Sequence, residues 1–179
     1  MALSCKLNKE LLKGDNCGYV LQSVTNIYLA NAADVTFATA ESDPYLVTGV
    51  TGGEWFKIEP AKNTASFTDV LNVTDSGNKY RTHSLSFSVI GVYSDELQEA
   101  LDQLSLGSYV AFAQFASGDA VLLGSPSAGL EATVVTNTGS ASATEASGIS
   151  VEMSADLTNS AYAFTEGEMK AIVDAEAGA

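Results

Sequence analysis

His83 is the only histidine in the chain, so any serine or cysteine nucleophile that needs an imidazole base would have to use it. It stands just before a stretch of alternating serines and apolar residues, a place typical of a partly exposed histidine at the end of a strand. No nucleophile motif accompanies it. We therefore predict no catalytic residue, and we expect that the chain is not an enzyme.

Cys5 and Cys17 are the only cysteines. Together with one distant histidine they cannot complete a tetrahedral metal site. The glycine-rich segment 49–53 lacks the spacing and the Lys-Ser/Thr pair of a phosphate-binding loop. We therefore expect no metal and no cofactor. The two thiols could form a disulfide, although synthesis in the cytoplasm favours their reduced state.

Acidic residues are frequent and unevenly placed. The stretch between Arg81 and Lys170 holds eleven Asp and Glu residues and no Lys or Arg, and the formal net charge is −14. A glycosidase pair needs a defined separation and one raised pKa, neither of which a sequence shows, so these acids are interpreted as solvated surface. This concentration of negative charge repels polyanions. It therefore excludes a nucleic-acid-binding site in this stretch, because such sites depend on basic side chains.

The composition is that of a folded protein. Of 179 residues, 46% are hydrophobic and only 17% charged, which predicts one domain over residues 1–165 with a real core. No run of about 18 apolar residues predicts a membrane span. The N-terminus is interrupted by charges and has no signal-peptide pattern, so we expect the protein to be made and assembled in the cytoplasm. Residues 166–179 are expected to form a C-terminal extension that is short, frayed, helical or ordered only against a neighbour.

Alternation of apolar and polar residues is the dominant local signal, and it predicts half-buried antiparallel strands. The resulting fold class is mainly β, a sandwich or barrel with one flanking helix. Strands are predicted at 19–30, 35–39, 45–51, 54–59, 66–73, 83–89, 108–115, 120–123, 129–134 and 148–156. Polar turns are predicted at 75–78 and 117–119, and a longer loop at 136–147.

The helix is predicted over about 94–106. Ser94 suits its N-cap and Gly107 its C-terminal end. Leu97, Leu101 and Leu104 form a stripe that should face the sheet, with the acidic side chains in water.

Two groups of outward side chains are candidates for function. On the strands that begin near 129 and 148, alternation places the apolar residues Leu130, Ala132 and Val134 inward. The outward set on these strands is Glu131, Thr133, Ser150, Glu152, Ser154 and Asp156. In the segment 54–59, Phe56 and Ile58 are expected inward, which leaves Trp55, Lys57 and Glu59 outward. Trp55 is then either a rim residue of the fold or an anchor at a subunit interface.

The order of these pieces resembles the major tail tube proteins of tailed bacteriophages, especially those of phages and prophages of Bacteroidetes hosts. The segments that carry the resemblance run along most of the chain. They are Cys5 and Cys17, then 25–31, 55–60, 64–69 and 80–89 before the helix, and 122–124 and 129–133 after it. The residues 166–179 and the weakly charged turn 117–119 depart from the family pattern.

The resemblance implies a structural virion protein that forms rings, of about six copies, stacked into the tail tube. Trp55, Lys57 and Glu59 would lie at the subunit interface. The residues of the outward set would line an acidic lumen that passes genomic DNA without tight binding. The implied partners are other copies of the chain and further tail proteins, namely the tape measure, the terminator and the baseplate or distal tail proteins. A tube of a contractile injection or secretion system, and a pilus-like surface adhesin, are the alternatives.

Overall fold

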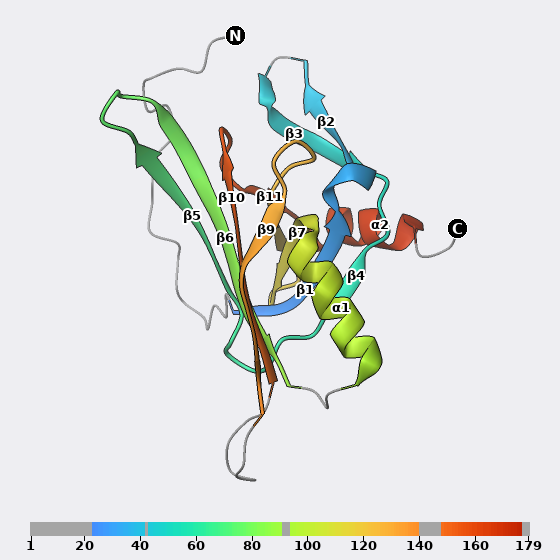
Figure 1. The fold of residues 1–179 in the computed structure, drawn as a ribbon. Helices are drawn as coiled ribbons and strands as arrows, with labels where there is room; N and C mark the ends of the chain where they lie inside the picture. The colour runs from blue at the N-terminus through green and yellow to red at the C-terminus, as the bar shows by residue number, and fades with distance from the viewer. Residues whose placement is uncertain (1–22, 42, 91–93, 140–147, 177–179) are drawn as a thin grey trace, which may run out of the picture.

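The computed structural model describes residues 23–41, 43–90, 94–139 and 148–176 (Figure 1). Cys5, Cys17 and the start of the first predicted strand lie outside these residues. The described chain is mainly β and antiparallel, as predicted. The strands are β1 (Val24–Asn31), β2 (Thr36–Ala40), β3 (Asp43–Thr51), β4 (Phe56–Ile58), β5 (Ser66–Val73), β6 (Lys79–Val89), β7 (Ser108–Phe115), β8 (Ala120–Leu123), β9 (Leu130–Thr138), β10 (Gly148–Leu157) and β11 (Tyr162–Phe164). The helices are a 3₁₀ turn (Ala32–Asp34), α1 (Asp95–Leu106) and α2 (Glu166–Glu176).

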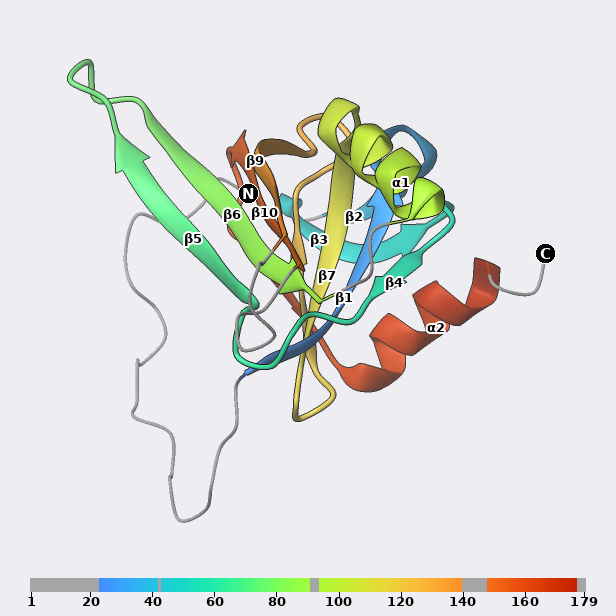
Figure 2. The ribbon, with the colours of Figure 1, turned by 60° about the horizontal axis from the view of Figure 1, so that its bottom comes forward.

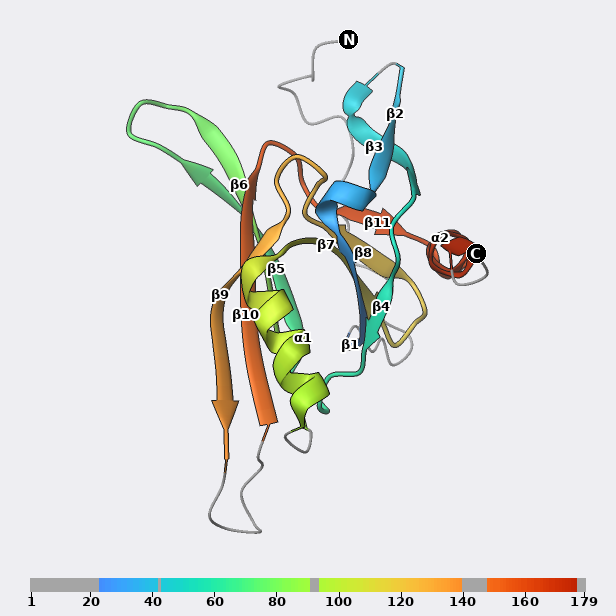
Figure 3. The ribbon, with the colours of Figure 1, turned by 45° about the vertical axis from the view of Figure 1, so that its right-hand side comes forward.

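Nine strands form one sheet in the order β11-β8-β7-β9-β10-β6-β5, with β1 on the other edge of β7 and β4 beyond β1. Strands β7 and β9 share only two paired positions, Ser108 with Glu131 and Tyr109 with Leu130. The sheet folds over at this short junction, and β9, β10, β6 and β5 lie across from β1, β7 and β8 (Figure 3). Strands β2 and β3 pair only with each other among the described strands and form a separate arm.

The first core fills the space between the two layers. Its buried members include Ile27, Leu85, Phe87 and Val151. Helix α1 packs Leu101 and Leu104 against this core, as the leucine spacing predicted, and Gly107 ends the helix by donating its N–H to the Gln103 carbonyl at 2.9 Å. The side chain of Leu97 is outside the description.

A second core lies on the other face of β7 and β1. Because β7 is covered on both faces, its side chains alternate between the cores, and Val110 and Phe112 belong to the second. Phe112 meets Phe164 edge-on with ring centroids 5.4 Å apart. Helix α2 closes this core with Met169, which is completely buried. Figure 2 shows α2 as a separate rod on this side of the molecule.

Helix α2 begins with a side-chain cap. Glu168 accepts hydrogen bonds from the N–H and hydroxyl of Thr165, at 2.9 and 2.7 Å. The C-terminal segment is thus helical, one of the expected states, and it is ordered against its own chain. Its side chains pack in the second core, as Met169 shows.

Both predicted turns join paired strands. Gly118 turns β7 into β8 with a φ of 98°, and Gly77 turns β5 into β6 with a φ of 85°, conformations that glycine adopts without a steric penalty. The β5–β6 hairpin extends beyond the body of the molecule (Figures 1 and 2).

Candidate functional surface

One face of the layer formed by β5, β6, β10 and β9 points away from the first core and carries polar side chains. The register places them directly across from one another: Ser88 pairs with Ser150, Ser86 with Glu152 and Ser84 with Ser154. We call this surface the polar face. It consists of Ser66, Thr68, Thr82, Ser84, Ser86, Ser88, Glu131, Ser150, Glu152, Ser154 and Asp156.

Four hydroxyl groups of the polar face bind one another in two pairs. Ser88 and Ser150 join across β6 and β10 with 2.8 Å between their Oγ atoms. The Ser66 and Ser86 hydroxyls are also 2.8 Å apart, across β5 and β6. Because these hydroxyl groups already bind each other, they have fewer free donors and acceptors with which to bind another molecule.

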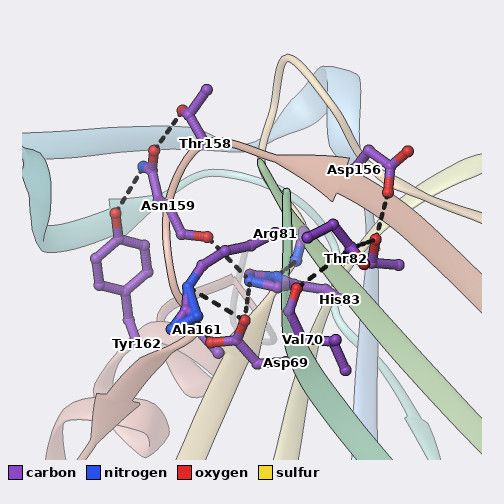
Figure 4. Close-up of polar contacts among 12 residues, drawn as sticks. Asp69, Val70, Arg81, Thr82, His83, Asp156, Thr158, Asn159, Ala161 and Tyr162 are labelled. Atoms are coloured by element: carbon purple, nitrogen blue, oxygen red, sulfur yellow. Dashed lines mark hydrogen bonds and ion pairs between the residues drawn. The ribbon is translucent and has the colours of Figure 1, made fainter. Parts of the chain in front are cut away.

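A longer chain of hydrogen bonds crosses three strands. The amide of Asn72 donates to the Thr82 hydroxyl at 2.7 Å, and Thr82 donates to a carboxylate oxygen of Asp156 at 2.6 Å. Figure 4 shows the second of these contacts. Asp156 is therefore held in place by the sheet rather than projecting freely.

The charge of the polar face is entirely negative. It comes from Glu131, Glu152 and Asp156, and no described position of the face holds lysine or arginine. The basic residues of β6, Lys79 and Arg81, alternate with the polar-face positions and belong to the other side of the strand.

Strand β9 departs from the predicted alternation at Thr133. The register runs from Glu152 opposite Val134 to Met153 opposite Ala132, so Thr133 is the extra residue of a β-bulge. Its hydroxyl donates to the Glu152 carbonyl at 3.1 Å. The bulge turns Val134 outward, where 45% of it is exposed. The predicted inward position of Val134 is wrong, while Glu131 and Thr133 are exposed as expected.

His83 lies beneath the polar face and is only 1% exposed (Figure 4). Its Nδ1 accepts the N–H of Gly124 at 3.2 Å, which places the proton on Nε2, and Nε2 donates to the Asn159 carbonyl at 3.1 Å. The predicted exposed strand end is wrong because β6 begins at Lys79, so His83 sits mid-strand on the face of Leu85. Since both ring nitrogens are occupied and buried, the ring is poorly placed to accept a proton from a substrate.

Two charged residues surround the imidazole. Asp69 Oδ1 is 3.8 Å from His83 Nε2 and 3.5 Å from Arg81 Nε, and its other oxygen accepts the N–H of Ala161 at 2.9 Å. Burial lowers the pKa of His83 below its ordinary value, against the opposing pull of Asp69. The cluster therefore connects β5 and β6 to the segments that follow β8 and β10.

Trp55 faces the second core, where its ring centroid is 4.8 Å from that of Phe112. The predicted outward orientation is wrong because α2 and the β2–β3 arm supply a second core on that side of the sheet. Phe56, expected inward, is 51% exposed. Lys57 and Glu59 form an exposed ion pair of 2.6 Å. The place of Trp55, Lys57 and Glu59 at a subunit interface stays a prediction.

Within the described ranges, no three His, Cys, Asp or Glu side chains come together as metal ligands. No described helix combines the length and apolar character needed to cross a membrane. Comparisons with protein-family models, with curated proteins and with solved structures found no match.

Proposed function

We propose that the protein is a structural subunit of a bacteriophage tail tube, which forms stacked rings whose channel conducts DNA during ejection. The observation that carries this proposal is the polar face, an acidic and hydroxyl-paired surface without described cations, built on the side of a sheet that turns away from the core. The resemblance in the order of sequence segments points the same way.

Electrostatics favour such a surface for a conduit. Phosphates are repelled by Glu131, Glu152 and Asp156, and repetition of these side chains around a ring and along a tube would give a continuous field of one sign. A DNA strand would meet few groups that bind it, since no lysine or arginine lines the described face. The proposed lumen is therefore a surface that DNA slides past.

Ring formation needs a lateral contact, and β5 offers one. Among the described strands it pairs with β6 alone, so no described strand takes up the main-chain groups of its outer edge, and we propose that another copy does. The proposed partners are copies of the same chain, with the tape measure, terminator and baseplate or distal tail proteins at the tube ends. The proposed location is the virion, after assembly in the bacterial cytoplasm.

Negative-stain electron microscopy and light scattering of the purified protein test the proposal. We expect rings or tubes with a central channel, and a mass that grows with protein concentration. A monomeric mass at every concentration and salt level would overturn the proposed function.

Binding to double-stranded DNA is a second test. In a mobility-shift assay we expect no retarded band, because nothing on the polar face releases counterions from phosphate. A salt-sensitive complex formed by the assembled protein would contradict an acidic lumen.

A further inference from the structure

The projecting β5–β6 hairpin exposes apolar side chains on the face that continues beyond the first core. Phe67 of β5 still packs, with its ring 5.8 Å from that of Phe115. Farther along the same face, Leu71 and Val73 extend past the core and are 54% and 59% exposed. Their cross-strand neighbours on β6 are basic. We call this surface the hairpin flank; it consists of Leu71, Val73, Lys79 and Arg81.

The outward side of helix α1 carries an exposed apolar side chain together with acidic residues. Leu106 is 90% exposed, and Asp95, Glu99 and Asp102 precede it at helical spacing on the side away from Leu101 and Leu104. These side chains of α1 surround a shallow depression of about 400 Å³ on the surface of the helix. We call this surface the helix ridge; it consists of Asp95, Glu99, Asp102 and Leu106.

We propose that the hairpin flank of one copy docks on the helix ridge of the next copy, an inference that rests on the proposed assembly into rings. The flank exposes two apolar side chains and the ridge one, each beside charged residues, and the signs of the charges are opposite. Lys79 is the exposed cation of the flank, because Arg81 already lies 3.5 Å from Asp69. The acidic Asp75 belongs to the turn between β5 and β6 and lies outside the flank.

The geometry makes this contact a head-to-tail one. The hairpin and α1 occupy separate parts of the molecule (Figures 2 and 3). In a dimer joined by two different surfaces, one hairpin flank and one helix ridge remain unoccupied. Further copies can therefore add at these free surfaces until the ring closes. The occupant is thus a second copy of this chain, which carries both complementary surfaces.

Disulfide trapping tests the contact directly. Cys5 and Cys17 are replaced by serine, and Leu71→Cys protein is mixed with Leu106→Cys protein under mild oxidation. We expect a crosslinked dimer of the two variants, and a ladder of higher species when both cysteines are in one chain. Val70→Cys is the matched control, because Val70 is 49% exposed on the opposite face of the same strand.

Charge reversal supplies a second readout. Lys79→Glu and Asp102→Lys should each raise the concentration for half-assembly about tenfold, and combining them in one chain should restore much of the loss. Lys62→Glu is the control, since Lys62 is exposed but precedes β5 and lies outside the flank.

The outcomes separate this contact from the proposed function. Tubes or rings that form while Leu71→Cys links no better than Val70→Cys, or that ignore both charge reversals, would overturn the docking and leave the tube proposal standing. Crosslinks between two Leu71→Cys copies would also overturn it, because they require a symmetric contact. A strictly monomeric protein would overturn both proposals.

Discussion

His83 is a residue whose importance is structural. It joins three parts of the chain, because Gly124 and Asn159 bind its two nitrogens and Asp69 lies beside the ring. The Gly124 contact requires a neutral imidazole, because protonation would remove the acceptor on Nδ1, and burial of the ring favours the same state against the opposing pull of Asp69. Removing a buried partner costs more than the mean value of a hydrogen bond, since the remaining donor stays buried and unsatisfied.

The stability of the fold should therefore depend on pH through His83. Because burial lowers the folded-state pKa below the ordinary 6.5, the unfolded chain binds the proton more readily. The contribution of His83 is complete above pH 6.5 and is lost as the pH falls through the lower folded-state pKa. We expect the melting temperature to fall between about pH 7.5 and about pH 5.5. The His83→Gln variant should show a smaller change over that interval.

Nuclear magnetic resonance provides a direct check, because the chain has a single imidazole and its ring signal is unambiguous. Titration of the folded protein should give a pKa for His83 below 6.5. A pKa at or above that value would contradict the neutral, doubly bonded ring.

At the scale of elements, α2 behaves as part of the fold. Met169→Ala should lower the free energy of unfolding by about 2–5 kcal/mol, because it opens a cavity at a fully buried position. Urea unfolding followed by the fluorescence of Trp55 measures this, since the chain's only tryptophan lies in the same core. Asp174→Ala, at an exposed position of α2, is the control and should leave the midpoint almost unchanged. Equal effects of the two variants would show that α2 does not seal the second core.

At the scale of the whole molecule, the two sides of the layer that contains β9 and β10 should respond to charge in opposite ways. The double variant carries Glu131→Lys and Glu152→Lys. Each substitution should change the free energy of unfolding by less than about half a kcal/mol, because both positions are exposed. Asp156 is left intact because Thr82 binds it. Val151→Asp should prevent folding, since it would bury an unpaired charge in the first core.

The consequence of the double-lysine variant should appear in DNA transport. A ring of lysines repeated along the tube would hold phosphates that the acids repel, so we expect phage assembled with this variant to eject DNA slowly or incompletely. Ejection rate and infectivity, read beside the thermal melts, are the measurements. Normal ejection would show that the polar face does not line the channel, and unfolding of the lysine variant would show that its positions are not free surface.

The sequence by itself determined the features that depend on near neighbours. Alternation fixed which sides of β6 and β10 are apolar, because successive side chains of a strand point to opposite faces. The leucine spacing placed Leu101 and Leu104 of α1 against the core. Glycines located the turns at Gly77 and Gly118, since few other residues adopt a positive φ without strain.

Only the tertiary structure decided what covers each face. Trp55 packs inward because α2, distant in sequence, folds onto the far side of β7. Val134 turns outward because of a bulge that depends on the pairing of β9 with β10. His83 is buried where segments after β8 and β10 meet β6. In each case the deciding contact comes from residues far along the chain, and local periodicity carries no information about such contacts. The exposure of the hairpin flank likewise depends on where the first core ends, which only the tertiary structure shows.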